Sequence, residues 1–429
     1  MERIAVIGSG IAGLAAARGL SRLPAGHHVT LFEGGAHFGG HANTVDVTLG
    51  GVTHGVDTGF LVYNERTYPQ LVKMFAELAV EVAASDMSFS VQARTAGLEW
   101  SGCNLASVFA QRRNLARPAF WRMLSDIARF NRLTSAIAQR GEEARLGMSI
   151  GAFLDAHGFS PEFRQWYFLP MVGCIWSCPS EQMLAFPIAT LIRFCHNHGL
   201  LQVTDRPQWY TVKGGSRHYV KRIVVGLADA RLNTPVRGVR RVGVGALVKT
   251  DAGVEHFDQV VFACHSDQAL RLLGDDATAD EAHVLGAIRY QPNRAVLHTD
   301  ATLMPTRRRA WAAWNYESGA EGEGRGVCLH YWLNRLQPLP WQQPVIVSLN
   351  PLREPRADSV VRSVEYDHPV FDLGAIAAQR RLPEIQGQRR TWFCGAWTGY
   401  GFHEDGLTSG LAVVAALAHP SDARLKGAA

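Results

Sequence analysis

A glycine-rich turn between a buried strand and a helix opens the chain and constrains the fold more than any other feature. The apolar run 3–7 is typical of a strand buried on both faces, and it leads directly into residues 8–13, whose sequence is G-S-G-I-A-G. Residues 12–23 are rich in alanine and leucine and predict a helix, and a second buried strand over 29–33 ends in an acid. This order of elements predicts a Rossmann-like nucleotide-binding unit.

Each residue type in this unit has a physical role in holding a dinucleotide. The first glycine permits the tight turn, the second lets the backbone approach a pyrophosphate, and the third allows the helix to pack closely on the strand. The amino end of the helix supplies unpaired N–H groups, and the terminal acid can accept hydrogen bonds from ribose hydroxyls. A glycine-rich turn in another kind of α/β protein is the alternative, but strand, spacing, helix and acid all agree with dinucleotide binding. The expected contacts are those of Gly8, Gly10, Ile11, Ala12, Gly13 and Glu33.

Length and composition place the chain among ordinary globular proteins. Its 429 residues exceed a usual single domain and favour two domains. A hydrophobic content of 47% excludes a disordered chain, and 42 glycines without a fixed period exclude a collagen-like one. The 43 basic residues, against 38 acidic ones, are almost all arginine, which favours phosphate or carboxylate partners. Because these residues are spread along the sequence, nucleic acid is not expected as a partner.

The cysteines and the apolar stretches bear on the cellular compartment. Seven cysteines without a C-x-x-C pair indicate neither a disulfide framework nor a zinc site, so we expect reduced thiols, no metal and a cytoplasmic protein. The first residues lack the basic and apolar regions of a signal peptide. The longest uncharged stretch, 165–180, is interrupted by Pro170, Gly173 and Pro179, so no transmembrane helix is expected.

A second glycine-punctuated segment lies near the other end of the chain. Residues 392–394 read as a short apolar strand, residues 395–406 contain repeated glycines, and residues 407–418 read as an apolar helix. The amino end of this helix would face an anion or a carbonyl group. A buried helix with a flexible preceding loop is the alternative, but two such cradles favour one cofactor at which both parts of the chain meet.

These segments resemble the flavin amine oxidase and phytoene desaturase superfamily. In that family a Gly-Gly turn and a threonine follow the second strand, as in residues 39–44, although His41 stands where members usually carry arginine. Residues 56–64, 233–241 and 392–410 resemble the flavin-contacting segment, the adenine-side strand and the closing flavin motif. The resemblance implies bound FAD. It carries over contacts from Gly39, Gly40, His41, Thr44, Asp57, Thr58, Gly59, Phe60, Val236, Gly395, Glu404, Asp405, Gly406 and Leu407.

The resemblance and the motif positions imply a discontinuous architecture of mixed α/β (α+β) class. Residues 1–80, 205–265 and 385–429 are expected to form the FAD-binding domain. Residues 81–204 and 266–384 are expected to form an inserted substrate domain of helices and an antiparallel sheet. Apolar residues at helical spacing over 120–137 predict a helix packed on the core, with Asp126 on its polar face.

A finer resemblance appears in residues 330–337, 348–351, 366–371 and 401–406. These strings look like one bacterial subgroup, the predicted NAD/FAD-binding proteins encoded beside cyclopropane-fatty-acid-synthase-like methyltransferases, which includes the flavin-dependent desaturase of furan fatty acid biosynthesis. The resemblance implies that a methylated unsaturated fatty acyl chain, within phospholipid, is desaturated to a conjugated diene by hydride transfer to flavin N5. His403, Glu404 and Tyr331 are the candidate catalytic residues.

Two clusters of arginine and aromatic residues bear on where the substrate resides. They span 109–122 and 307–314. Arginines facing anionic headgroups, with aromatic rings at the boundary, would suit peripheral docking on the inner face of the cytoplasmic membrane, and a solvated basic face is the alternative. The other expected partners are the lipid or fatty acyl substrate, the neighbouring methyltransferase and a second copy of the chain in a homodimer.

Other functions stay open at this point. A flavin amine oxidase is the enzymatic rival, although many such enzymes place a lysine near flavin N5, and Lys213 is the only lysine of this chain in a recognisable motif. A flavin-loaded, non-catalytic partner of the methyltransferase would carry the same binding motifs. A nicotinamide-dependent dehydrogenase disagrees with the closing flavin motif.

Overall fold

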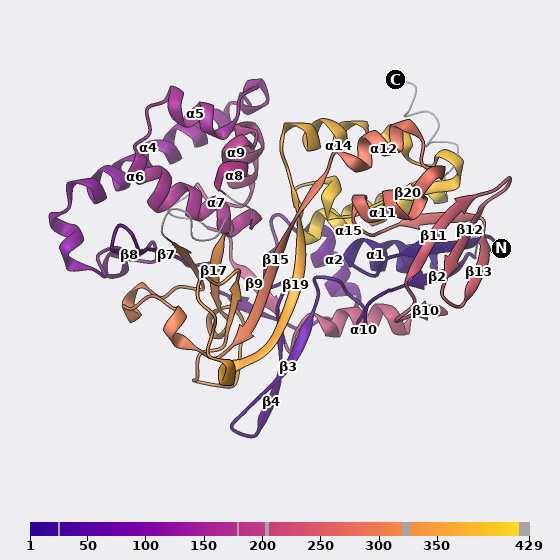
Figure 1. Ribbon diagram of the computed structural model, residues 1–429, viewed down its shortest axis with the longest axis horizontal. Coiled ribbons are helices and arrows are strands. Elements are labelled where there is room, and N and C mark those ends of the chain that lie inside the picture. The colour runs from indigo at the N-terminus through magenta and orange to yellow at the C-terminus, as the bar shows by residue number, and fades with distance from the viewer. Residues whose placement is uncertain (25, 178–179, 202–205, 320–326, 420–429) are drawn as a thin grey trace.

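The computed structural model describes residues 1–24, 26–177, 180–201, 206–319 and 327–419. Cys178 and residues 420–429, which enter the predictions above, lie outside these ranges, and the six described cysteines are free. A part that carries the N-terminus lies at one end of the molecule and a group of helices at the other (Figure 1). Two long strands, β15 (Arg289–His298) and β19 (Val360–Val370), run between them (Figure 1). No helix within the described ranges is long and apolar enough to cross a membrane.

A five-stranded parallel sheet forms the centre of the N-terminal end. In β1, Ile4 and Val6 belong to one core cluster while Ala5 and Ile7 belong to another, as expected of a strand buried on both faces. The predicted Rossmann-like, mixed α/β fold is confirmed. The strand order is β10 (Asp229–Arg231), β2 (His28–Phe32), β1 (Arg3–Ile7), β14 (Gln259–Phe262) and β20 (Thr391–Phe393), so that distant parts of the sequence lie side by side.

Helices cover one face of this sheet. Helix α1 (Ile11–Leu20) crosses α15 (His403–Ala418) closely because the two helices meet at glycines. A Cβ at Gly410 would lie only 2.3 Å from the carbonyl oxygen of Ala12. Helices α2 (Pro69–Glu77) and α10 (Arg217–Val225) pack beside this pair. The two cradles predicted from the sequence are therefore held together by direct helix packing.

The opposite face of the sheet carries three helices and a small antiparallel sheet. These elements are α11 (Ser266–Leu273), α12 (Ala279–Gly286), α14 (Leu373–Ile385), β11 (Val236–Arg241), β12 (Ala246–Thr250) and β13 (Gly253–Phe257). Leu273, Val284 and Ala375 share a core cluster with Phe262 of the parallel sheet. The structure thus differs from the predicted domain boundaries, which assign α11, α12 and α14 to the substrate domain. These helices pack here because the sheet face would otherwise be exposed.

A seven-stranded sheet lies beside the cavity described below. Its order is β19, β15, β18 (Ile346–Leu349), β17 (Cys328–Trp332), β16 (Trp314–Ser318), β7 (Phe89–Ala93) and β8 (Leu98–Ser101). All neighbours are antiparallel except β16 and β7, which are parallel. This is the predicted antiparallel sheet with one parallel pair added, and β7 of that pair comes from an earlier part of the chain.

The helices between β8 and β9 (Trp209–Val212) form the other end of the molecule. Helix α4 confirms the helix predicted over 120–137, with Phe120, Met123 and Phe130 buried. The placement of Asp126 on a polar face is wrong, because its buried side chain accepts a hydrogen bond from the Ser160 N–H at 3.0 Å. The helices are α3 (Leu105–Val108), α4 (Pro118–Gln139), α5 (Ile150–Ala156), α6 (Pro161–Phe163), α7 (Leu169–Trp176), α8 (Ser180–Ala185) and α9 (Ile188–Asn197).

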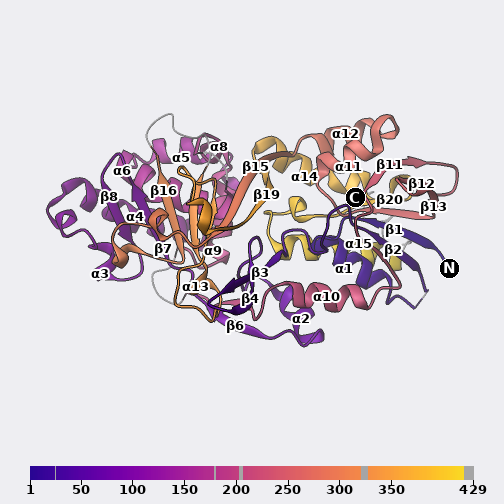
Figure 2. The same ribbon diagram turned by 60° about the horizontal axis from the view of Figure 1, so that its bottom comes forward.

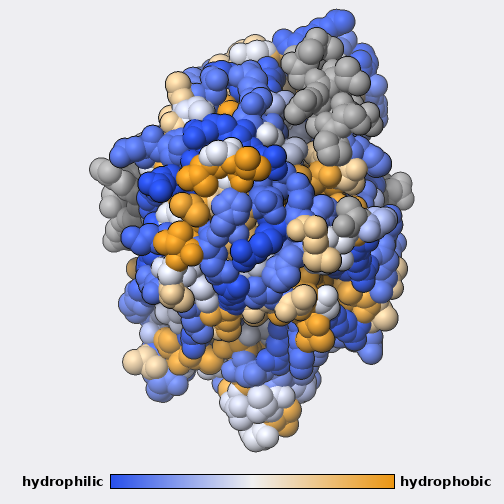
Figure 3. Space-filling model, turned by 90° about the vertical axis from the view of Figure 1, so that its right-hand side faces the viewer, coloured by the Kyte–Doolittle hydropathy of each residue, from blue (hydrophilic) through white to orange (hydrophobic). Residues whose placement is uncertain are grey.

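Short elements complete the fold. They are the hairpin β3 (Thr44–Leu49) and β4 (Val52–Asp57), the small strands β5 (Tyr63–Asn64) and β6 (Val82–Ser85), and helix α13 (Leu333–Leu336). The end of the molecule opposite the helices is covered mostly by hydrophilic residues, with apolar residues in several patches between them (Figure 3).

Candidate functional site

A cavity of about 910 Å³ extends from the parallel sheet to the helical end. This volume is at the upper end of the roughly 300–1,000 Å³ usual for ligand pockets. Its nucleotide arm is lined by residues 7–12, 32–35, 39–41, 234–237 and 263–265. Its substrate arm is lined by Met87, Phe89, Met171, residues 174–177, Phe194, His198, Leu200, Trp209, Trp314, Tyr331, Val347 and Leu349. Residues 58–62, 366–369, 395–397 and 400–403 also line the cavity, so both predicted cradles meet there.

The glycine turn after β1 forms one wall of the nucleotide arm. Gly8 has a φ of +104°, which residues with a side chain rarely adopt, and a Cβ at Gly13 would lie 1.9 Å from the Gly8 carbonyl oxygen. By contrast, a Cβ at Gly10 would meet no atom within 4 Å. Gly8 and Gly13 therefore shape the turn, while Gly10 keeps the space above the amino end of α1 open. This cradle fits the pyrophosphate of FAD.

Glu33 is oriented at the end of β2 by backbone groups of the same wall. Its carboxylate accepts hydrogen bonds from the N–H of Ser9 at 3.1 Å and the N–H of Gly35 at 2.7 Å. Oε2 accepts from both the N–H and the hydroxyl of Ser9, whereas Oε1 accepts from Gly35 alone and keeps a lone pair for a ribose hydroxyl. Ser9 was not predicted as a site residue, although its place inside the glycine motif was an available signal.

Residues 39–41 fold over the glycine turn. A Cβ at Gly40 would lie 3.2 Å from the Cα of Gly10, and a Cβ at Gly59 would lie 2.3 Å from the carbonyl oxygen of His41. The N–H of Phe60 donates to that same carbonyl at 2.7 Å. Glycine at these positions therefore allows three backbone segments to approach one another. Thr58, Gly59 and Phe60 all line the cavity.

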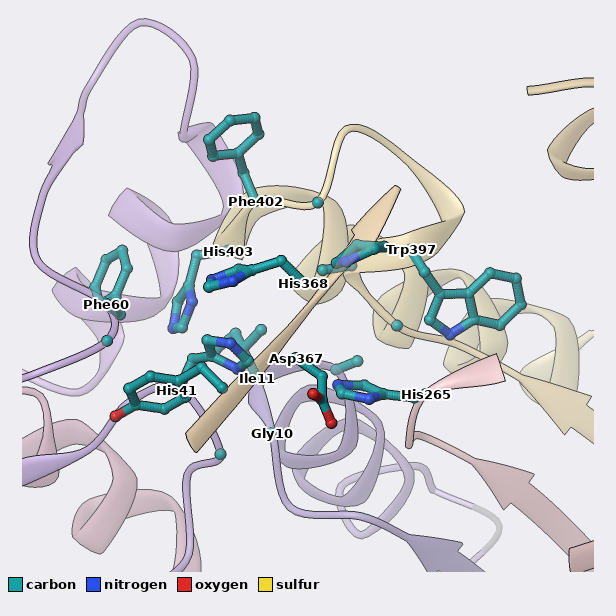
Figure 4. Close-up of a pocket in the computed structure, with 18 of the residues that line it drawn as sticks. Gly10, Ile11, His41, Phe60, His265, Asp367, His368, Trp397, Phe402 and His403 are labelled. Atoms are coloured by element: carbon teal, nitrogen blue, oxygen red, sulfur yellow. The ribbon is translucent and has the colours of Figure 1, made fainter. Parts of the chain in front are cut away.

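Neutral histidines surround the middle of the cavity (Figure 4). His41 stacks on Tyr366 with ring centroids 4.8 Å apart. Burial lowers its pKa well below the usual value, and so does the repulsion that His368 and other neighbouring histidines would exert if they were protonated. Burial likewise lowers the pKa of His368 to about 4 and that of His403 to about 3. At position 41 the structure therefore presents an uncharged imidazole, where the sequence resemblance implied that an arginine would be usual.

His403 is held between two other side chains. Its ring stacks on Phe60 with centroids 3.8 Å apart and an interplanar angle of 10°, and its Nε2 lies 2.6 Å from the hydroxyl of Tyr219. The imidazole lines the cavity at the amino end of α15 (Figure 4). Sequence reasoning missed Tyr219 and also His265, which lines the nucleotide arm and stacks on Tyr290 at 4.4 Å. Neither residue lies in a motif that could have identified it.

The sequence resemblance predicted that Thr44 and Asp57 contact the cofactor. In the structure both residues lie behind the cavity wall. The Thr44 hydroxyl donates to Asp57 at 2.6 Å, and Asp57 also accepts hydrogen bonds from the N–H of Ser216 at 2.9 Å and the amide of Gln337 at 2.9 Å. Burial raises the pKa of Asp57 above its ordinary value despite these bonds. Asp57 thus joins β4 to the start of α10 and to Gln337, which follows α13. Neither Thr44 nor Asp57 lines the cavity.

Residues of the first turn of α15 were predicted to contact the cofactor, but their side chains are engaged elsewhere. The Glu404 carboxylate accepts hydrogen bonds from the N–H groups of Gln70 at 2.7 Å and Leu71 at 3.0 Å, so it caps α2. Asp405 caps its own helix by accepting from the N–H of Phe402 at 2.9 Å. Gly406 approaches Ile11, where a Cβ would lie 2.7 Å from the Ile11 side chain, and Leu407 is buried. None of the described residues 404–407 lines the cavity, so Glu404 is not placed to act as a catalytic residue.

The remaining predicted residues do line the cavity. Val236 lies in the nucleotide arm, Gly395 lies near the start of α15, and Tyr331 projects from β17 into the substrate arm. Tyr331 packs edge-to-face on Trp314 with centroids 4.9 Å apart and shares a hydrogen bond with Ser177. The contacts of these residues with a cofactor or a substrate stay predictions.

The substrate arm is apolar, aromatic or neutral throughout its described lining. Phe194 stacks on Phe402 with centroids 4.9 Å apart, and the indole N–H of Trp176 donates to the Tyr400 carbonyl at 3.2 Å. These contacts tie the helical end to the loop before α15. Among the described residues that line this arm, none is aspartate, glutamate, lysine or arginine.

A buried polar cluster lies outside the cavity lining, on β16 and β17. Glu317, Cys328 and His330 bring potential metal-ligand atoms within 4.8 Å of one another. However, His330 Nε2 lies 2.8 Å from Glu317, His330 Nδ1 lies 2.7 Å from the Ser348 hydroxyl, and Glu317 also pairs with Arg94. Burial opposes the charged imidazole, but Cys328 and Glu317 raise the pKa of His330 to about 9. We interpret the cluster as a buried ion pair, since its members satisfy one another.

Comparison with known proteins agrees with this geometry. Residues 11–307 match the family model described as flavin containing amine oxidoreductase. The search of curated proteins found no match. Among solved structures, the CLA-producing fatty acid isomerase from P. acnes is similar to this chain with a TM-score of 0.68 and 16% identity, covering 96% of this chain and 98% of the other.

Two amine oxidase structures share the fold to the same degree. Putrescine oxidase bound to putrescine has a TM-score of 0.67 and 16% identity over 97% of this chain and 98% of the other. Cyclohexylamine oxidase from Brevibacterium oxydans IH-35A has a TM-score of 0.67 and 16% identity over 98% of this chain and 99% of the other. The cradle, the oriented acid and the family match lead to one conclusion: the chain belongs to the flavin containing amine oxidoreductase family and is an FAD-dependent oxidoreductase.

Proposed function

We propose that this oxidoreductase desaturates a methylated, unsaturated fatty acyl chain, held within phospholipid, to a conjugated diene. The observation that carries the proposal is the uncharged lining of the substrate arm. A hydrocarbon chain gains from leaving water for such a lining, whereas an ammonium group would lose its hydration without meeting an opposite charge. The arm therefore suits an acyl chain better than a charged amine.

Two further observations support an acyl substrate. One solved structure of the same fold is named as a fatty acid isomerase, so this fold accommodates a fatty acid in at least that protein. In addition, none of the described residues lining the cavity is a lysine, the residue that many amine oxidases of the family place near the flavin. The finer sequence resemblance to proteins encoded beside lipid methyltransferases points in the same direction.

The residues of this chain position the substrate and exclude water. When bound, FAD supplies the hydride acceptor. The aromatic groups Trp314, Tyr331 and Phe402 would hold an allylic carbon in a fixed orientation and keep water from it. Because its pKa is lowered to about 3, His403 stays neutral and is a weak proton acceptor, so we assign it a positioning role. Tyr331 is the retained candidate for direct contact with the acyl chain.

The substrate class can be tested with the purified holoenzyme under anaerobic conditions. We expect phospholipid with methylated unsaturated acyl chains to bleach the yellow flavin absorbance, and mass spectrometry to show a product lighter by two hydrogens. A panel of amines should leave the absorbance unchanged. Bleaching by amines with no change in any lipid would reject the acyl proposal in favour of an amine oxidase.

A variant within the substrate arm sharpens this test. Met171→Glu places a carboxylate in the uncharged arm, and we expect it to lower turnover of the acyl chain at least about tenfold because the carboxylate must be buried or hydrated there. Met171→Leu, which keeps size and polarity, should retain most of the activity. An amine oxidase would respond in the opposite way, since a carboxylate would attract the ammonium group.

We also propose that the methyltransferase encoded beside proteins of this kind supplies the methylated acyl chain, and that the reaction takes place on the cytoplasmic side of the membrane. Cells that express the methyltransferase with this protein should contain conjugated acyl chains, and cells that express the methyltransferase alone should contain only the methylated precursor. Identical acyl-chain mass spectra from the two strains would contradict the proposal.

A further inference from the structure

Two segments that are far apart in the sequence form one exposed surface at the helical end. Helix α3 contacts the 3₁₀ helix of residues Arg308–Ala310, and α4 contacts the 3₁₀ helix of residues Arg112–Ala116. Figure 2 shows α3 at the end of the molecule farthest from the N-terminus. We call this surface the basic tip, and it consists of residues 102–122 and 306–309.

The basic tip exposes large apolar side chains that a purely solvated face would not require. Leu105, Leu115 and Trp121 are 79%, 53% and 49% exposed. Trp121 is held in place, because its indole N–H donates to the Leu115 carbonyl at 2.9 Å and its ring lies 5.5 Å from that of Phe109. The fixed tryptophan and the two leucines therefore present an apolar surface to whatever lies outside.

The charge of the basic tip is positive and largely uncompensated. Residues 102–122 include four arginines and no acidic residue. Two arginines of the tip have acidic partners, Arg122 with Glu162 at 2.7 Å and Arg307 with Glu99 at 3.3 Å. The others form no ion pair with any described residue; these are Arg112, Arg113, Arg117, Arg308 and Arg309.

We propose that the basic tip docks the protein on a bilayer containing anionic phospholipid. Guanidinium groups bind phosphate oxygens in a planar, bidentate geometry, while tryptophan and leucine enter the boundary between headgroups and acyl chains. A nucleic acid would satisfy the arginines but would leave Leu105 and Leu115 in water, so the apolar part of the surface favours a lipid. The proposal goes beyond the proposed reaction, because docking requires no particular acyl chain.

Vesicles of fully saturated lipid test docking apart from turnover. Holoenzyme should sediment with vesicles of phosphatidylglycerol and phosphatidylcholine and remain in solution with phosphatidylcholine alone. Reversing two charges in Arg112→Glu/Arg309→Glu should weaken binding to the anionic vesicles about tenfold or more. Leu105→Ser/Leu115→Ser should also weaken binding, which a purely electrostatic contact would not show. All variants should keep the thermal unfolding midpoint and flavin content of the unmodified protein.

Two controls keep the result specific to the basic tip. Arg240→Glu and Val244→Ser change an exposed arginine and an exposed valine on or next to β11, outside the tip, and should leave vesicle binding unchanged. A polarity-sensitive fluorophore on the exposed Cys103, in a Cys178→Ser background, should shift to shorter wavelength with anionic vesicles only. Equal binding to both vesicle types, full binding by the charge-reversed variant, or capture by a short DNA duplex but not by vesicles would each overturn the proposal.

Discussion

The hydroxyl of Tyr219 lies 2.6 Å from Nε2 of His403, which joins the first turns of α10 and α15 beside the cavity. Tyr219 is fully buried, and His403 is stacked on Phe60. With Nε2 engaged in this way, the orientation of the imidazole is fixed. Its other nitrogen, Nδ1, forms no hydrogen bond with any residue that the structure describes.

Tyr219→Phe removes the partner of His403 while keeping the ring. We expect the free energy of unfolding to fall by about 1–3 kcal/mol, because a buried imidazole nitrogen loses its hydrogen bond. Urea unfolding of the flavin-free protein measures this change. Tyr63→Phe is a suitable control, because the Tyr63 ring is buried and its contacts are with other aromatic rings. Equal losses in the two variants would show that the Tyr219–His403 hydrogen bond contributes nothing specific.

Two glycines of the nucleotide turn should respond differently to alanine, one through stability and the other through FAD binding. Gly13→Ala places a Cβ 1.9 Å from the Gly8 carbonyl oxygen, so we expect a loss of about 3 kcal/mol of unfolding free energy even without cofactor. Gly10 has a φ of −60° and open space at its Cβ position, so Gly10→Ala should change stability by less than about 1 kcal/mol. Gly10→Ala should nevertheless weaken FAD binding at least about tenfold, since the methyl group enters the pyrophosphate cradle. Thermal unfolding and flavin titration separate the two effects.

Glu33 and Glu404 provide a second pair with different expected outcomes. Glu33→Gln removes the charged acceptor at the ribose position, and FAD affinity should fall about tenfold because hydrogen bonds to charged groups contribute roughly 1.5–3 kcal/mol. Glu404→Gln weakens the cap of α2, so unfolding free energy should fall by about 1 kcal/mol while FAD affinity is kept. Loss of flavin in Glu404→Gln at unchanged stability would contradict the structural role assigned to Glu404.

The buried histidines predict how stability depends on pH. The pKa of His368 is lowered to about 4 in the folded protein, while the unfolded chain has the ordinary value near 6.5, so the unfolded state binds the proton first as pH falls. Stability contributed by neutral His368 is present above about pH 6.5 and is lost as pH falls towards 4. His368→Gln should reduce the loss of unfolding free energy between these pH values by up to about 3 kcal/mol. The measurement is the free energy of unfolding as a function of pH, for unmodified and variant protein without flavin. Equal slopes in the two proteins would contradict this assignment.

Local patterns predicted the nucleotide side of the fold well. The strand 3–7, its glycine turn and the helix after it depend on residues close in sequence, and the structure has β1 and α1 in these places. The side chain of Asp126 was misplaced because helical periodicity cannot show a partner from another segment, here the N–H of Ser160. The sequence likewise could not show that α11, α12 and α14 pack on the parallel sheet, because a short amphipathic helix can pack on either part of the molecule.

The candidate site was predicted where backbone shape decides it and less well where side-chain direction decides it. Gly8, Gly10 and Gly59 lie at the cavity because close backbone approach requires them. Glu404 lies in the closing flavin motif, but its side chain points to α2. The direction of one side chain on the first turn of a helix cannot be derived from spacing alone. His265 and Tyr219 reach their places through tertiary packing, for which the sequence carries no local signal.

The pairing of distant strands has a consequence for biosynthesis. Strand β14 pairs with β1 on one side and β20 on the other, and β16 pairs with β7, so both large sheets combine early and late parts of the chain. During translation, the face of α1 that packs on α15 stays uncovered until α15 has left the ribosome. A nascent chain that ends before α15 lacks one wall of the cavity. Capture of the flavin is therefore expected only after α15 has been synthesised.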